Sequence, residues 1–450
     1  MINKILLIIV ITNIMLLSSV STALEVRITE EIEFITVMHN DKPLVIQRNQ
    51  DQNNMINPEF AKTSRPCPPF CIKPIIIVDG VETIIDLDMF EYLQNDDSVV
   101  IDSRTVAWVA KGSIPGSINL PWDIFDNATD DVLQILLKEQ FNVTIGNNNY
   151  YFDTAKTLVL FCNGPWCNQS PTSINSLLKL GYPKEKLKWY RGGMQSWESL
   201  GLTTVTDVLI PKISLSTKIL DLLTLPPENT TFTTWSNWFK HLIFVWQDHE
   251  SEIKITPDVK EVPVIHNDRE ILIKRNPNKN NTIKPEFAKT SRPCPPQCLQ
   301  STDLVEDVEI IAELEVLDYL KKISAGDNSI LVIDSREIDW VVKGSIPGTV
   351  NIPWDILSGK KSSPPIVKKL LEEQIGVKID HEGKFSFEDA KTLVIFCNGP
   401  WCNKSHDNVA TLLEFGYPSE KLKWYRGGMQ AWESFGLTTV KDIPMPWFGL

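Results

Sequence analysis

Two short segments of the chain each place a pair of cysteines five residues apart. Cys162 and Cys167 enclose Asn-Gly-Pro-Trp, and Cys397 and Cys402 enclose the same four residues. A thiol attacks as its thiolate, so a reactive cysteine needs surroundings that lower its pKa from about 8.5. We predict reactive thiols at Cys162 and Cys397. The second cysteine of each pair either resolves a persulfide or sulfenate by forming a disulfide, or is disulfide-bonded at rest.

The residues around each pair are typical of a strand, a tight loop and a helix. Leu158 to Phe161 is a short apolar strand, Cys162 follows at once, and a helix begins near Ser170. α/β proteins place their sites at the carboxyl ends of parallel strands. The free N–H groups and positive end of the next helix lower a thiol pKa. The loop residues expected to form this amide cradle, or to pack beside it, are Asn163, Gly164, Trp166, Asn398, Gly399 and Trp401.

Both cysteine segments belong to an internal duplication. Four further segments recur in the same order: FAKTSRPCPP, IDSR, KGSIPG and KLKWYRGGMQ. Each copy spans roughly 200 residues, which is too long for a solenoid repeat and indicates two duplicated domains.

Each copy has a front part and a back part. The front part carries short alternating apolar runs around His39 and His266, which predict a hairpin with the histidine in an exposed turn. The back part alternates short apolar strands with helical patterns, so we predict an α/β fold with a parallel sheet flanked by helices, preceded by a small β extension. The predicted segments are a signal peptide (1–23), a β extension (24–75), a first domain (76–205), a linker (206–249), a second β extension (250–302), a second domain (303–442) and a tail (443–450).

The front parts contain their own cysteine pairs, Cys67 with Cys71 and Cys294 with Cys298, each enclosing two prolines. Three alternatives remain open. The pairs could form structural disulfides, act as a redox or sulfur relay, or join the loop cysteines in a metal site. The Cys-x₃-Cys spacing is not that of a zinc ribbon, so no metal is predicted.

The amino terminus predicts export. Lys4 precedes an apolar run from Ile5 to Leu17, and Ser21-Thr22-Ala23 forms a small-residue cleavage site. We therefore expect a periplasmic or secreted protein in an oxidising compartment, with no membrane span after signal cleavage. The net charge of -13 argues against nucleic acid or an anionic membrane surface as the main partner.

The order of motifs in each copy resembles the rhodanese family. A strand leads to Asp-x-Arg, followed by an Ile-Pro-Gly stretch, the cysteine loop, and Gly-Gly-x-x-x-Trp. The resemblance covers about 81–205 and about 309–440. It implies a compact α/β domain whose cysteine accepts a sulfane sulfur and passes it on. It implies that Asp102 with Arg104, and Asp334 with Arg336, brace the fold by ion pairing. Arg191 and Arg426, just before the Gly-Gly turns, become candidates to lie near the loop.

The chain departs from the family pattern at the loop. Many thiosulfate-using members carry a cation there, whereas the first loop has none and the second has only Lys404. An anionic donor would then depend on backbone amides alone. Ser113 and Ser345 stand where the family often has His, at a position that is usually structural. A closing arginine that phosphatase relatives use is also missing, which disfavours phosphatase activity.

Three functions follow from these patterns. The first is a sulfurtransferase or sulfane-sulfur carrier that needs no cofactor and has a small sulfur-containing donor and a thiol or protein acceptor as partners. The second is a thiol–disulfide oxidoreductase that cycles the loop pair. The third is a non-catalytic binding module in which the cysteines are structurally locked.

Overall fold

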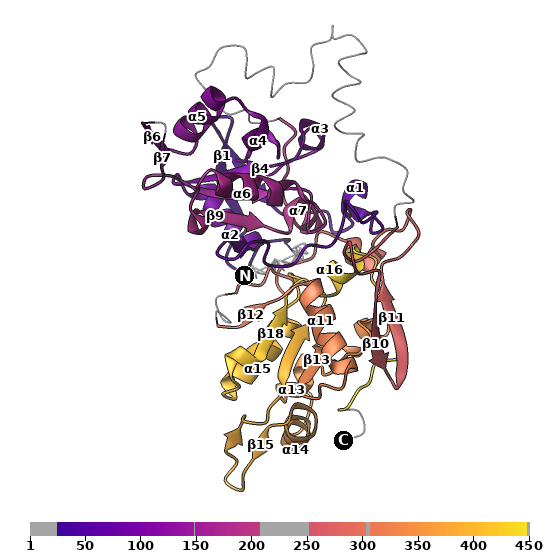
Figure 1. The fold of residues 1–450 in the computed structure, drawn as a ribbon. Coiled ribbons are helices and arrows are strands. Elements are labelled where there is room, and N and C mark those ends of the chain that lie inside the picture. The colour runs from indigo at the N-terminus through magenta and orange to yellow at the C-terminus, as the bar shows by residue number, and fades with distance from the viewer. Residues whose placement is uncertain (1–24, 148, 208–251, 303–306, 448–450) are drawn as a thin grey trace, which may run out of the picture.

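The computed structural model describes residues 25–147, 149–207, 252–302 and 307–447. The predicted signal peptide and nearly all of the predicted linker lie outside these ranges. Figure 1 shows the first copy, indigo to magenta, above the second, orange to yellow. No helix within the described ranges is long and apolar enough to cross a membrane.

Each copy contains a five-stranded parallel sheet with matching strand order. In the first copy the strands, in spatial order, are β3 (Glu82–Ile84), β9 (Leu187–Tyr190), β8 (Thr157–Phe161), β4 (Ser98–Asp102) and β5 (Ile118–Asn119). In the second they are β12 (Glu309–Ile310), β18 (Leu422–Tyr425), β17 (Thr392–Phe396), β13 (Ile330–Asp334) and β14 (Val350–Asn351). The central strands are apolar on both faces because helices cover both, which confirms the predicted fold class.

Helices follow the strands in the same order in both copies. Those of the first copy are α2 (Asp86–Gln94), α3 (Val106–Val109), α4 (Ile124–Asn127), α5 (Asp130–Glu139), α6 (Gln169–Lys179) and α7 (Gly193–Ser199). Those of the second are α11 (Glu313–Ser324), α12 (Ile338–Val341), α13 (Trp354–Leu357), α14 (Pro364–Lys369) with a π-turn at Leu370–Ile375, α15 (Lys404–Glu414) and α16 (Gly428–Ser434). Small antiparallel hairpins add β6 (Thr144–Gly146) with β7 (Asn149–Tyr151) and β15 (Lys378–Ile379) with β16 (Phe385–Ser386).

The front parts form the predicted β extensions. β1 (Phe34–His39) pairs with β2 (Lys42–Gln47), and β10 (Glu261–His266) pairs with β11 (Arg269–Lys274). A one-turn helix then precedes each Cys-Pro-Pro segment, α1 (Pro58–Ala61) or α10 (Pro285–Ala288). Each extension also reaches the other copy, through backbone bridges that join Val26 to Cys294, Met55 to Lys289 and Lys62 to Thr282. One apolar cluster consequently spans both extensions and one face of both sheets.

The prediction that His39 and His266 are exposed turn residues is wrong. The hairpins turn where expected, but the two side chains are only 5% and 2% exposed. The Nδ1 of His39 accepts the N–H of Gly116 (3.2 Å), and that of His266 accepts the N–H of Gly348 (3.1 Å). These histidines therefore fasten each hairpin to the Ile-Pro-Gly turn of its own domain.

Two buried arginines connect the copies. Arg48 is fully buried and donates to four carbonyl oxygens, those of Leu200 (3.0 Å) and Arg27 (3.1 Å) in its own copy and Gln297 (3.2 Å) and Thr290 (3.1 Å) in the other. Arg275 makes the reciprocal set of contacts, with the carbonyl oxygens of Phe435, Lys254, Phe70 and Thr63. Because a guanidinium offers five donors and no acceptor, it suits a cage of carbonyl groups.

Replacing Arg48 with Met should lower the free energy of unfolding by about 3 kcal/mol, because several buried carbonyl groups lose their donor at once. Urea unfolding of the full chain measures the change. The matched control is Arg269→Met, since Arg269 pairs with Asp442 and its side chain is 61% exposed; this change should stay within roughly 0.5 kcal/mol. Equal effects of the two substitutions would contradict the structural role assigned to Arg48.

Candidate active site

The two cysteine loops occupy equivalent places. Cys162 follows β8 and Cys397 follows β17, each at the carboxyl end of its strand, and the next helix begins at Gln169 or Lys404. Cys162 is 2% exposed and Cys397 is 1% exposed, and the second cysteines are buried too. The loop is therefore shielded from water in both copies.

The loops differ in their sulfur chemistry. Cys162 and Cys167 form a disulfide, whereas Cys397 and Cys402 are free thiols. The Cys397 thiol lies 3.1 Å from the carbonyl oxygen of Cys402, and the Ser405 hydroxyl donates to the Cys397 sulfur at 3.0 Å. The same hexapeptide thus accommodates a dithiol and a disulfide.

The surroundings of Cys397 favour its thiolate. Burial raises the pKa of the thiol, but hydrogen bonds from the Cys402 thiol, the Ser405 hydroxyl and the backbone N–H groups of Ser405 and Gly399 outweigh burial and lower the pKa to about 7. Burial and the neighbouring Cys397 sulfur raise the pKa of Cys402 well above its ordinary value. Cys397 is therefore the more easily deprotonated thiol of this pair, and Cys402 donates a hydrogen bond to it.

The residues of a Gly-Gly turn hydrogen-bond to the backbone of each cysteine loop. The N–H groups of Met194 and Gln195 donate to the carbonyl oxygens of Cys162 and Asn163, both at 2.9 Å. A Cβ atom on Gly193 would lie 2.3 Å from the Cys162 oxygen, and this glycine has a φ of +52°. Only glycine permits this approach, so the turn that closes the domain also shapes the cysteine loop.

The β extension covers each loop. The Lys73 N–H donates to the Pro165 carbonyl oxygen (2.9 Å), and Phe70 packs edge-on against Trp166 with ring centroids 5.5 Å apart. Gln195 ties the layers together, because it accepts the Trp166 indole N–H (2.9 Å) and donates to the Phe60 carbonyl oxygen (3.1 Å). The second copy repeats the glutamine contacts through Gln430.

The Cys-Pro-Pro pairs form local disulfides within these covers. Cys67 bonds to Cys71 and Cys294 to Cys298. Of the three alternatives that the sequence left open, the disulfide is the one present here. No cluster of three or more potential metal-ligating side chains occurs among the described residues.

The extension also supplies a cation that the loop sequence lacks. The Arg65 guanidinium lies 3.9 Å from the ring centroid of Trp166, and that of Arg292 lies 3.7 Å from Trp401. Burial, with the charge of Arg48, lowers the pKa of Arg292 to about 9. Each loop therefore has a guanidinium stacked on its tryptophan, in addition to the backbone amides on which the sequence inference relied.

Sequence reasoning missed Arg65 and Arg292 because it searched for cations within the loop itself. Each lies about 100 residues before its cysteine in the chain, and only the packing of the extension brings it close to the loop. A signal was present, since the segment Ser-Arg-Pro-Cys is identical in both front parts.

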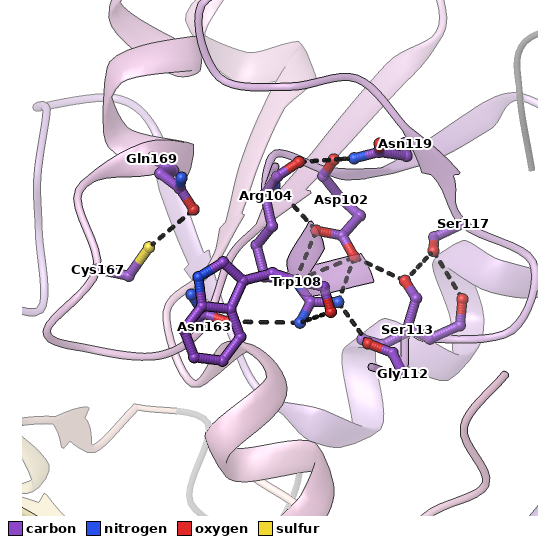
Figure 2. A network of polar contacts seen from close by, with 11 residues as sticks. Asp102, Arg104, Trp108, Gly112, Ser113, Ser117, Asn119, Asn163, Cys167 and Gln169 are labelled. Atoms are coloured by element: carbon purple, nitrogen blue, oxygen red, sulfur yellow. Dashed lines mark hydrogen bonds and ion pairs between the residues drawn. The ribbon is translucent and has the colours of Figure 1, made fainter. Parts of the chain in front are cut away.

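The Asp-x-Arg pair also contacts the cysteine loop, through Asn163, as Figure 2 shows. Arg104 forms a fully buried ion pair with Asp102 (2.6 Å) and reaches the side-chain oxygen of Asn163 (3.4 Å). Ser113 donates to the same carboxylate at 2.7 Å. Asp334, Arg336, Asn398 and Ser345 repeat this network in the second copy.

Arg191 and Arg426 pair with carboxylates across the boundary between the copies. The Arg191 guanidinium lies 2.6 Å from Glu313, and that of Arg426 lies 3.0 Å from Asp86. These groups line a cavity of about 150 Å³ between the domains, into which Pro165 and Pro400 of the two loops also face. The arginines are thus near the loops but are engaged at the interface.

Replacing Ser405 with Ala should raise the pKa of Cys397 from about 7 to about 8 or higher, because a hydrogen bond to a charged group contributes roughly 1.5–3 kcal/mol. The absorbance of the thiolate should rise as the pH passes through the pKa of Cys397, and this rise should occur at a higher pH in the variant than in the wild type. Ser170→Ala is the control: Ser170 contacts Cys162 (3.2 Å), which is disulfide-bonded, and both serines also accept a tryptophan N–H. Identical titrations of wild type and Ser405→Ala would contradict the assignment.

The family model described as "Rhodanese-like domain" matches residues 87–200 and 316–435, together just over half of the chain. No curated protein sequence matches the chain.

Several solved structures are similar to parts of the chain. A rhodanese-related protein from Thermoplasma volcanium is 23% identical, with 28% of this chain and 99% of that chain covered and a TM-score of 0.20. A thiosulfate sulfurtransferase from Pseudomonas aeruginosa is 13% identical over 81% of this chain and 44% of its own length, with a TM-score of 0.23. The SseA protein from Escherichia coli, described as a 3-mercaptopyruvate sulfotransferase, is 13% identical over 77% and 97%, with a TM-score of 0.22. With the two matches of the family model and the two parallel sheets, the chain belongs to the rhodanese-like domain family.

Proposed function

We propose that this protein is a sulfurtransferase or sulfane-sulfur carrier in which Cys397 receives the sulfur as a persulfide. The observation that carries the proposal is the set of hydrogen bonds around Cys397. Donors from Cys402, Ser405 and Gly399 converge on a sulfur whose pKa is about 7, so much of it is thiolate at neutral pH. The same donors would stabilise the terminal anion of a persulfide.

The proposed transfer has two steps. The Cys397 thiolate attacks the sulfane sulfur of a donor, a new S–S bond forms, and the donor's own S–S bond breaks with its electron pair leaving on the rest of the donor. A thiolate acceptor then attacks the outer sulfur of the persulfide. The Cys397 thiolate departs with its electron pair, ready for another cycle.

The extension limits which donors fit. Because Cys397 is 1% exposed, a donor reaches it only after the segment that carries Arg292 and Cys294 opens locally. Arg292 would attract an anionic donor, which the net negative charge of the chain does not. These features favour a small anionic sulfane compound over a bulky one.

A second function is favoured by the disulfide between Cys162 and Cys167. If the Cys402 thiolate attacked the inner sulfur of a Cys397 persulfide, the loop would become a disulfide and hydrogen sulfide would leave. An external dithiol would then reduce the loop and be oxidised itself. This cycle is a thiol–disulfide exchange that uses the same pair of cysteines, and the first loop already has the disulfide form.

We also propose that the protein acts outside the cytosol, in the periplasm or as a secreted protein. Support comes from the signal-like first 23 residues. The two Cys-Pro-Pro disulfides suit an oxidising compartment. In such a compartment the loop pair would need a dedicated reductant to stay in the dithiol form.

Incubating the reduced full chain with a polysulfide donor should add one sulfur atom to the peptide that contains Cys397, as read by mass spectrometry after alkylation. Cys397→Ser should abolish the addition at this loop. Cys402→Ser should keep it, because the acceptor sulfur remains. No added sulfur on either wild type or Cys402→Ser would sink the sulfur-carrier proposal, and loss of dithiol oxidation in Cys402→Ser alone would favour the exchange function.

Arg292→Met should slow persulfide formation from thiosulfate about tenfold, as expected for loss of roughly 1.4 kcal/mol of charge attraction. It should leave the rate with a neutral organic trisulfide nearly unchanged. The ratio of the two rates within one variant removes any effect of partial unfolding. Arg65→Met, which changes the arginine at the first loop, is the matched control for the rate of persulfide formation at Cys397. An unaltered ratio of the two rates in Arg292→Met would contradict a role in attracting the donor.

A further inference from the structure

The residue that precedes the short helix of the β extension is a lysine in the second copy only. Lys284 precedes α10, and its ammonium lies 2.6 Å from the Glu433 carboxylate and 3.3 Å from the Thr439 hydroxyl. The corresponding residue before α1 is Asn57. Its side chain turns back to accept the N–H of Glu59 and caps that short helix.

The first copy keeps the acceptors of this site without the ammonium. Glu198 and Thr204 correspond to Glu433 and Thr439. A Cβ atom on Gly112 would lie 3.8 Å from the Glu198 carboxylate oxygen and 3.7 Å from the Thr204 hydroxyl, so both oxygens lie beside this glycine. A Cβ atom on Gly344, the equivalent glycine of the second copy, would lie 3.4 Å from the Lys284 ammonium.

The Glu198 carboxylate has no hydrogen-bond or ion-pair partner within the described ranges. Burial raises its pKa, and the charge of Arg104 opposes that effect. The nearby Lys111 ammonium pairs with Glu59 at 3.6 Å instead. A partly desolvated carboxylate without a direct ion-pair partner is costly, so a bound cation would stabilise it.

A polar pocket of about 640 Å³ opens onto this carboxylate. Arg48 also contributes to the wall, but four carbonyl groups already accept its N–H groups. Such a volume is within the range of small-molecule sites. The other lining groups are mostly amides and hydroxyls, including Gln47, Asn49, Thr203 and Thr204.

We propose that this pocket binds a small molecule with a primary amine. Its ammonium would lie between Glu198 and Thr204, where the second copy holds the ammonium of Lys284. The amide and hydroxyl groups of the wall would contact the polar body of the molecule. The proposal is independent of sulfur transfer, because none of the loop cysteines lines the pocket.

n-Butylamine tests the proposal because it reproduces the Lys284 side chain beyond Cα. Calorimetric titration of the full chain should show one site with a Kd on the order of millimolar. Glu198→Gln should weaken binding at least tenfold, since the ion pair is lost. Asn57→Lys should abolish binding, because the chain then supplies its own ammonium as the second copy does.

The reciprocal substitution can be made in the second copy. Lys284→Asn should create an equivalent site, so the stoichiometry should rise from one to two. Glu433→Gln in an otherwise unchanged chain is the matched control and should leave binding at the first copy as it was. Should Glu198→Gln fail to fold, the stoichiometries of Asn57→Lys and Lys284→Asn still decide the matter.

The proposal is overturned if wild type binds no butylamine at tens of millimolar, or if Asn57→Lys binds it as well as wild type. It is also overturned if tetramethylammonium, which cannot donate a hydrogen bond, competes equally, because that would reveal mere charge screening. Displacement of butylamine by other primary amines but not by the matching alcohols would support it.

Discussion

Burial of the cysteine loop is the constraint on which the rest of the site depends. Removing a thiolate from water raises its pKa, so a buried Cys397 would be inert without compensating donors. The strand, the loop glycine and the first turn of α15 bring those donors to one sulfur, and their combined effect exceeds that of burial. The cover that excludes water therefore strengthens the same hydrogen bonds that lower the pKa of the sulfur.

The β extension that covers each loop also places a positive charge beside it. A loop with several cations of its own would hold mutually repelling groups in a buried space, whereas here one arginine stacks on a tryptophan ring from outside the loop. Stacking against an aromatic face lets a guanidinium lose water at a modest cost. Each loop thus has a positive charge beside it that comes from its extension.

Local patterns predicted the sheets and the loop well. The apolar run from Leu158 to Phe161 became β8, and the helix expected near Ser170 begins at Gln169. These elements depend on residues close in sequence: a continuous apolar strand, a glycine-containing loop and a glycine stop. Both copies repeat this pattern, so the two segments predict the same elements.

Contacts between distant segments could not be predicted in this way. Arg48 reaches Thr290 across 242 residues, and nothing in either segment marks the other as its partner. His39 was assigned to the surface because it adjoins a turn, yet the Ile-Pro-Gly segment 77 residues later buries it. Periodicity reports which face of an element is covered, but it does not report what covers it.

The exchange of contacts makes the duplicated chain a single folding unit. Arg191 needs the carboxylate of Glu313, Arg426 needs that of Asp86, and each buried arginine cage includes carbonyl groups from both copies. A single copy would leave these charges and carbonyl groups buried without partners or exposed to water, and either outcome is unfavourable. The extension that covers a cysteine loop is held in part by the other copy. The cover over the Cys397 loop therefore depends on contacts from both copies, whereas the donors that lower the pKa of Cys397 all belong to the second copy.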